Sequence, residues 1–139
     1  MNWFIWALLS AFFAGATAIL AKIGVSGVNP NLATAIRTTV VLFFTWGIAL
    51  ATTSTASVHT FSKRTWTFLV LSGVATGLSW LCYFHALQLG QASRVAPVDK
   101  LSVVFVIVFA AIFLHEQLTW HHWVGGALIV SGAVILAFK

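Results

Sequence analysis

Charged residues are scarce in this sequence, which has seven Lys and Arg and two Asp and Glu among 139 residues. They make up 6% of the chain, against about 25% in a typical soluble domain. Hydrophobic residues make up 60%. Such a chain cannot cover a water-exposed surface with polar groups, so its composition predicts a membrane protein. The net charge of +5 has no basic run or polar face to carry it, which argues against nucleic-acid binding.

Cysteine pairs and catalytic motifs are also lacking. The single Cys82 cannot form an internal disulfide. The segment "HEQLTWH" places His115 and His121 six positions apart, whereas the zinc motif H-E-x-x-H needs a spacing of four. The segment "GLSWL" around Ser79 lacks the second glycine of a nucleophile elbow. We therefore expect no enzymatic activity, no metal and no cofactor.

Long apolar windows dominate the sequence instead. A helix needs about 20 mostly apolar residues to cross a bilayer. Five windows have this length: residues 3–24, 31–53, 65–88, 93–115 and 118–138. No window of about ten residues alternates between apolar and polar positions, which excludes a membrane β-barrel. The predicted fold is an all-α membrane protein, one domain over residues 1–139 with five transmembrane helices in a compact bundle.

The distribution of positive charge bears on orientation. Five crossings place the termini on opposite faces of the membrane, and the Trp residues gather near the N-terminal face, as an interfacial belt does. At loops and helix ends, the C-terminal face carries Lys22, Arg94 and Lys139, and the N-terminal face carries Lys63 and Arg64. Because this difference is small, we expect single copies to insert in both orientations.

Small residues mark two helix faces. In lipid, helices associate through close backbone packing, which small residues permit. Gly73 and Gly77 form a G-x-x-x-G in the third window, where packing within one subunit and packing between subunits remain equal alternatives. In the last window, Gly125 and Gly132 lie seven positions apart, beside Ser131. We expect these three residues to form the seam of a dimer.

Polar and aromatic side chains lie deep in the third window: Thr76, Ser79, Trp80, Tyr83 and Gln88. Trp80 and Tyr83 are three positions apart and share one helix face. Their N–H and O–H groups need hydrogen-bond partners at this depth, which favours a cavity over contact with lipid. Ordinary aromatic packing in the bundle is the alternative. We assign Thr76, Ser79, Trp80 and Tyr83 to a substrate cavity.

Charge also occurs inside the helices, where it is costly and generally faces a polar cavity or another charge. Arg37 and Asp99 both lie roughly 9 Å inside the C-terminal face, at a rise of about 1.5 Å per residue. Asp99 and Lys100 are adjacent, so their side chains diverge by about 100° and are not expected to pair. The sequence predicts Arg37 as the partner of Asp99, with Lys22 as second choice. Lys100 is then left for an anionic group of a substrate, and all three of Arg37, Asp99 and Lys100 belong to the predicted cavity.

Two further expectations concern Lys22 and the segment "SRVAPVDKLS", residues 93–102. Snorkelling to lipid headgroups is the alternative role for the basic residues, and the favoured one for Lys22 and Arg94. Pro97 is expected in the first turn of its helix, where a missing N–H costs little.

The stretch "SWLCYFHALQLGQASRVAPVDKLSVVFVIVFAAIFLHEQLTWHHWVGGALIVSGAVIL" resembles the second half of an EamA-type domain of the drug/metabolite transporter superfamily. The shared pattern is an aromatic-rich helix, a short A-S-x-V-A-P segment, an apolar helix ending in hydrophobic-x-E, and a Gly-rich last helix. The first two windows fit the same domain, so the resemblance covers the whole chain. It is greatest to the five-helix bacterial and archaeal members, which carry one such domain instead of two.

A more distant likeness is to the four-helix small multidrug resistance proteins. Their last helix dimerises through two glycines seven apart, the spacing of Gly125 and Gly132. Those proteins carry a Glu in the middle of the first helix that binds cation and proton, and the matching position here is Ala14. Proton-coupled export of hydrophobic cations by that mechanism is therefore not expected.

These resemblances imply one half of an inverted-repeat transporter, because full-length relatives join two such domains of opposite orientation. We expect a homodimer, antiparallel, in the cytoplasmic (inner) membrane of a bacterium or archaeon. It moves a small organic metabolite, such as an amino acid or organic acid, by alternating access. The excess of positive charge within the helices suggests an anionic or zwitterionic substrate. The alternative is a non-transporting membrane scaffold or accessory subunit.

Overall fold

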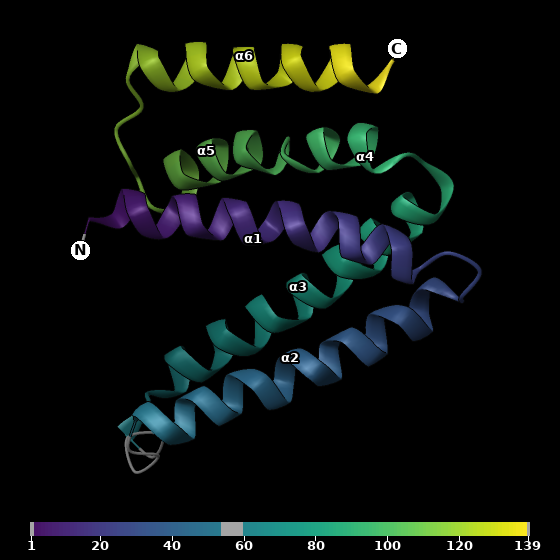
Figure 1. Ribbon diagram of the computed structural model, residues 1–139. Helices are drawn as coiled ribbons and strands as arrows, with labels where there is room; N and C mark the ends of the chain where they lie inside the picture. Colours follow the sequence, from purple (N-terminus) through teal and green to yellow (C-terminus); the bar gives the residue numbers. More distant parts are fainter. Residues whose placement is uncertain (1, 54–59, 139) are drawn as a thin grey trace. The chain divides into compact units, whose positions relative to one another are not determined.

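The computed structural model describes residues 2–53 and 60–138, and these ranges contain helices and no strand (Figure 1). The helices are α1 (Trp3–Gly24), α2 (Pro30–Thr52), α3 (Lys63–Leu89), α4 (Ala92–Asp99), α5 (Ser102–Phe113) and α6 (Trp120–Ala137). When α4 and α5 are taken as one span, five segments of the described chain are long and apolar enough to cross a membrane. The predicted all-α membrane fold with five spans is confirmed.

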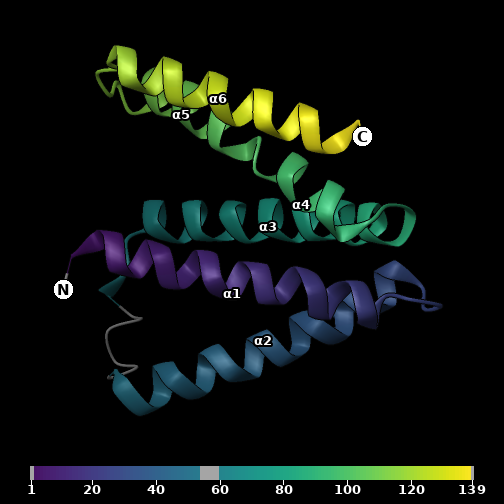
Figure 2. The ribbon, with the colours of Figure 1, turned by 45° about the horizontal axis from the view of Figure 1, so that its top comes forward.

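The chain divides into two units. The α2–α3 unit covers Ile23–Gln88, and the second unit contains α1, α4, α5 and α6, from Met1–Lys22 and Leu89–Lys139. In the second unit α6 packs along both α4 and α5. Both views show α6 beside α5, and α1 running in the same direction as α6 (Figures 1 and 2). The first and last of an odd number of crossings run in the same direction, and α1 and α6 do so. The packing of all five spans into one domain stays a prediction.

The start of α2 is fixed by local sequence. Asn29 is the N-cap, and its Oδ1 accepts hydrogen bonds from Asn31 N at 2.9 Å and Leu32 N at 3.4 Å. Pro30 occupies the first helical position, where its missing N–H leaves no hydrogen bond unmade. Before the cap, Gly27 has a φ of 73°, a left-handed conformation that glycine adopts without strain. Gly27, Asn29 and Pro30 thus fix the point at which the turn after α1 ends and α2 begins.

The fourth predicted span is not one continuous helix. The window 93–115 is interrupted at Lys100 and Leu101, so that α4 and α5 are separate (Figure 2). At the interruption the N–H of Lys100 donates to both Ala96 O at 3.3 Å and Pro97 O at 3.1 Å. The regular pattern of hydrogen bonds four residues back therefore changes at this point to one three residues back.

Pro97 lies three residues before the interruption, and its predicted position in the first turn is wrong. Because α4 already begins at Ala92, Pro97 lies inside the helix rather than in its first turn. A proline there removes a backbone hydrogen bond and its ring crowds the carbonyl four residues earlier, which breaks or kinks a helix. α4 ends at Asp99, two residues after the proline.

The link between the last two spans is also longer than predicted. α5 ends at Phe113 and α6 begins at Trp120, whereas the sequence predicted a very short turn between 115 and 118. His115 has a φ of 54°, a left-handed conformation uncommon for a residue with a side chain. The N–H of Glu116 then donates to Ala110 O at 3.2 Å, which closes the end of α5.

Burial is sparse in the described chain, as expected for helices whose apolar side chains face lipid. Among large side chains, Val25, Phe84 and Leu87 are nearly inaccessible, at 1%, 3% and 0% exposure. Phe84 and Leu87 lie in the C-terminal half of α3, and Phe84 forms part of the contact described next.

Candidate functional site

The site begins with a contact between α2 and α3. The guanidinium carbon of Arg37 lies 4.5 Å from the centroid of the Trp80 ring and 5.4 Å from that of Phe84. Trp80 and Phe84 are four positions apart on α3, so both rings face the same side of that helix. A guanidinium over an aromatic face is attracted by the electrons of the ring. The structure thus brings together two residues that the sequence placed in the site, Arg37 and Trp80.

No carboxylate of the same unit can neutralise Arg37. Residues 23–88 contain no Asp or Glu, and the two acidic residues of the chain, Asp99 and Glu116, lie in the second unit. Within the described part of the α2–α3 unit, the guanidinium lies beside the Trp80 and Phe84 rings and interacts electrostatically with Tyr83. A guanidinium has five N–H donors in one plane, which is the arrangement that binds a carboxylate or phosphate.

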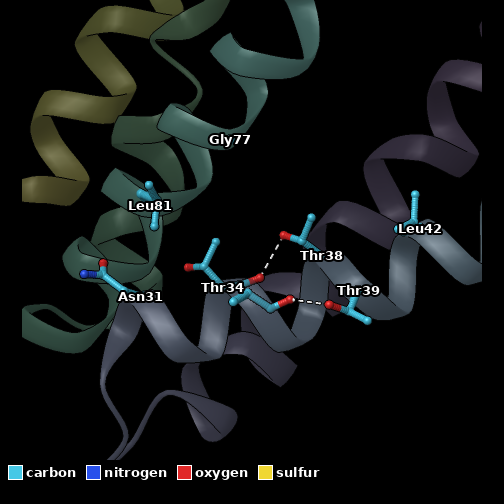
Figure 3. Close-up of a pocket in the computed structure, with 8 residues that line it drawn as sticks. Asn31, Thr34, Thr38, Thr39, Leu42, Gly77 and Leu81 are labelled. Carbon is cyan, nitrogen blue, oxygen red and sulfur yellow. Dashed lines mark hydrogen bonds between the residues drawn. The ribbon is translucent and has the colours of Figure 1, made fainter. Parts of the chain in front are cut away.

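A cavity of about 300 Å³ lies between the same two helices (Figure 3). Its α2 wall carries an amide and three hydroxyl groups, and its α3 wall is apolar. The principal lining residues are Asn31, Thr34, Thr38 and Thr39 from α2, and Gly77 and Leu81 from α3. Arg37 immediately precedes Thr38, and Trp80 immediately precedes Leu81, so the aromatic–guanidinium contact lies at the same level of α2 and α3 as the cavity, although neither Arg37 nor Trp80 is among its lining residues.

The threonines of the cavity share one hydrogen-bond pattern. The hydroxyl of Thr34 donates to Pro30 O at 2.8 Å, that of Thr38 to Thr34 O at 2.8 Å, and that of Thr39 to Ala35 O at 3.0 Å. Figure 3 shows the last two of these bonds as dashed lines. A hydroxyl has one hydrogen to donate and two lone pairs that accept. Because each hydrogen is used within the helix, the threonine oxygens that line the cavity act as acceptors.

Sequence reasoning missed these four polar residues of α2. A signal was present, because Asn31, Thr34 and Thr38 follow the i, i+3, i+7 spacing of one helix face in an otherwise apolar window. Gly77 was noticed for another reason, as part of a G-x-x-x-G. A Cβ placed on Gly73 or Gly77 meets no atom of the described chain within 4 Å. The motif therefore marks no close contact with α2 within the described part of the α2–α3 unit, and its role in helix packing stays a prediction.

The remaining predicted cavity residues of α3 are not among those that line this cavity. Thr76 is exposed and donates to Ser72 O at 2.9 Å. Ser79 is exposed, and Tyr83 is half-buried. A role for Thr76, Ser79 and Tyr83 in a substrate cavity stays a prediction.

Asp99 and Lys100 form an ion pair, contrary to the expectation that adjacent residues do not pair. The distance from Asp99 Oδ2 to Lys100 Nζ is 3.6 Å. Adjacent side chains leave a helix about 100° apart, but the Lys side chain is long and can bend back toward Asp99 where α4 ends. The favoured snorkelling role of Lys22 differs too, because its Nζ donates to Gly90 O at 2.8 Å. The pairing of Asp99 with Arg37 stays a prediction.

The last helix presents one small-residue face to its neighbours. Gly126 and Ala133 are buried, and a Cβ on Gly126 lies 3.8 Å from Cδ1 of Ile107 in α5. Gly125 and Gly132 precede these positions by one residue, and a Cβ on either meets no atom of the described chain within 4 Å. Ser131, also assigned to the seam, is exposed and donates to Ala127 O at 2.8 Å. The dimer seam itself stays a prediction.

Comparisons with known proteins give the family. A transporter from the cobO 3′ region of a Sinorhizobium species is 52% identical over 136 residues, which are 98% of this chain and 96% of that protein. The probable 4-amino-4-deoxy-L-arabinose-phosphoundecaprenol flippase subunit ArnE of Aeromonas salmonicida is 33% identical over 69 residues, 50% of this chain and 60% of that protein. The transporter YvbV of Bacillus subtilis is 34% identical over 87 residues, 58% of this chain and 28% of that protein.

No solved structure gives a significant match. Residues 1–138 match the EamA-like transporter family. The match covers the two helices that form the cavity and the four helices of the second unit. The resemblance seen in the sequence is therefore confirmed, and the chain belongs to the EamA-like transporter family.

Proposed function

We propose that two copies of this chain form an antiparallel homodimer that moves a small organic metabolite across the cytoplasmic membrane of a bacterium or archaeon. Each copy supplies one five-span half of a transporter. Alternating access in such folds arises when two related halves rock about a central site. Membership of a transporter family supports the transport role, and the small net difference of loop charge supports insertion in both orientations.

Arg37 is the observation that carries the proposal. An Arg inside a membrane helix is costly, up to about 2.5–3.5 kcal/mol at the helix centre on insertion scales, so such a residue is a candidate for a functional site. The Trp80 and Phe84 ring centroids lie 4.5 Å and 5.4 Å from the guanidinium carbon. The guanidinium group of Arg binds a carboxylate or phosphate in a bidentate manner. The substrate that fits this arrangement carries an anionic group, as an amino acid, an organic acid or a zwitterion does.

In the proposed cycle, the anionic group of the substrate replaces a protein carboxylate at Arg37. Asp99 is the candidate, because it is one of only two acidic residues in the chain. When the substrate occupies Arg37, Asp99 keeps Lys100, its partner at 3.6 Å. This exchange avoids leaving Arg37 uncompensated in either state, which is costly in a medium of low dielectric constant.

Transport by purified protein in liposomes tests the proposal. A thermal-shift screen of amino acids, organic acids and sugar phosphates selects the ligands, and uptake of the ligands that bind is then measured. We expect Arg37→Gln to reduce uptake more than tenfold, and Arg37→Lys to reduce it less. Arg94→Gln is the matched control, because Arg94 is exposed at the start of α4. Full uptake by Arg37→Gln contradicts the proposal.

The second candidate is an accessory subunit that does not transport by itself. The similarity to a probable flippase subunit over half of the chain favours this alternative. It predicts that the purified wild-type protein moves none of the solutes in liposomes and co-purifies with one defined membrane protein. Uptake that appears only when that partner is added identifies a subunit role.

A further inference from the structure

The α2 wall of the cavity accepts hydrogen bonds, and this property selects a kind of substrate. We propose that Thr34, Thr38 and Thr39, with Asn31 at the end of the wall, bind the hydrogen-bond-donating part of the transported molecule. The donating part is an ammonium or a hydroxyl group, and the anionic part of the same molecule binds Arg37. This inference rests on the proposed transport function and specifies its substrate class as a zwitterion or a hydroxylated anion.

The hydrogen bonds of the threonines give the chemical preference. Each hydroxyl hydrogen is held by a backbone carbonyl of the same helix, at 2.8 Å for Thr34 and Thr38 and at 3.0 Å for Thr39. A substrate acceptor therefore finds no free hydroxyl hydrogen on this wall, whereas a substrate donor finds lone pairs on each oxygen. Asn31, which is exposed, adds an amide that accepts through its oxygen and donates through its NH2 group, so the acceptor preference rests on the three threonines.

The two proposed poles lie at the same level of α2. Arg37 is three positions from Thr34, which is a rise of about 4.5 Å along the helix. Arg37 and Thr38 are adjacent, so their side chains leave the helix about 100° apart, and the substrate must span from the face of Arg37 to that of the threonines. The cavity of about 300 Å³ is at the small end of ligand sites, which range from about 300 to 1,000 Å³. It therefore fits a small metabolite.

Matched pairs of ligands test this inference. Binding to the purified dimeric protein in detergent is measured for the standard amino acids, for the hydroxy acids of the same carbon skeletons, and for the carboxylate of each skeleton that carries neither group. Thr38→Val and Thr39→Val keep the shape of the side chain and remove the oxygen. Thr38→Ser keeps the oxygen and removes the methyl group. Thr34 is left unchanged because it is buried.

Thr45→Val is the matched control. Thr45 lies on the same helix and donates to Val41 O at 2.8 Å, as the cavity threonines do, but it is not among the lining residues. We expect amino acids to bind more tightly than their partner carboxylates. The apparent Kd for the amino acid should rise about fivefold in Thr38→Val or Thr39→Val, the effect of one lost hydrogen bond. Thr38→Ser and Thr45→Val should leave the Kd within about twofold of the wild type.

The outcomes separate this inference from the proposed function. Carboxylates that bind as tightly as amino acids, or Thr→Val variants that bind amino acids normally, overturn the acceptor wall. Absence of binding to the wild type by both the amino acids and the hydroxy acids of the same carbon skeletons overturns it as well. In each case, uptake of another anion that Arg37→Gln abolishes leaves the proposed function standing. Uptake that does not depend on Arg37 overturns both.

Discussion

The contact between Arg37 and Trp80 should make a measurable contribution to stability. Replacing Trp80 by Leu removes the ring that lies 4.5 Å from the guanidinium carbon. Cation–π contacts contribute about 0.5–1 kcal/mol at exposed sites and about 2 kcal/mol when desolvated. Arg37 is half-buried, which places the contact between these limits. Phe84 remains at 5.4 Å and retains part of the interaction. We therefore expect a coupling free energy of about 1 kcal/mol, or about a fivefold change in an equilibrium constant.

A double-mutant cycle isolates this quantity. The free energy of unfolding is measured by titration with a denaturing detergent for the wild type, Arg37→Gln, Trp80→Leu and the double variant. The coupling free energy is the change in unfolding free energy of the double variant minus the sum of the changes of the two single variants. Trp46→Leu with Arg37→Gln is the matched cycle, because Trp46 lies on α2, is 51% exposed and is not in contact with Arg37 among the described aromatic pairs.

The result that refutes the reasoning is a coupling no larger than that of the Trp46 cycle, within about 0.3 kcal/mol. Trp80 would then be an ordinary packing residue, and the proposal that Arg37 is held beside aromatic rings for an anion would lose its support. A coupling well above about 2 kcal/mol contradicts the argument as well, because no cation–π contact of one Trp accounts for it.

Three further predictions concern the helix start, the last helix and the orientation. Asn29→Ala should lower the free energy of unfolding by about 1 kcal/mol, because α2 loses its side-chain cap at Asn31 N, and an unchanged unfolding curve contradicts this. Gly126→Leu should destabilise the fold, because Gly126 faces Ile107 of α5. Gly125→Leu combined with Gly132→Leu should instead convert the dimer to a monomer. Unchanged sedimentation of this double variant removes both glycines from the seam. A C-terminal reporter should appear on both sides of the membrane, and a one-sided result refutes dual insertion.

The spans could be predicted because hydropathy over about 20 residues is a strong and local signal. The first predicted window, 3–24, coincides with α1, and the second differs from α2 by one residue at each end. The break in the fourth window was not predicted. With the start at Ala92, Pro97 falls inside α4, which ends two residues later at Asp99. Sequence-based helix boundaries are uncertain by a few residues, and that uncertainty placed Pro97 in the first turn.

The site could be predicted in part, for a physical reason. Arg37 and Trp80 stood out because a charge and an indole are unusual deep in a membrane helix, and the structure brings them together. Thr34 and Thr38 did not stand out, because a threonine can satisfy its hydroxyl within its own helix and needs no partner elsewhere. Their meaning comes from the cavity that α3 completes, and a single sequence does not show which helix faces which.

Asp99 is the residue through which the second unit would act on this site. If Asp99 pairs with Arg37, Asp99→Asn leaves the guanidinium uncompensated and should lower the free energy of unfolding by about 3–5 kcal/mol, the effect of breaking a buried pair. Arg37→Gln with Asp99→Asn should recover most of that stability. A purely structural pair predicts that the double variant also regains uptake in liposomes, whereas a gate or site pair predicts that uptake stays lost. The ion pair with Lys100 gives the opposite expectation, because an exposed pair contributes about 0–1 kcal/mol. A fully stable and fully active Asp99→Asn variant therefore assigns Asp99 to Lys100 and removes it from the transport cycle.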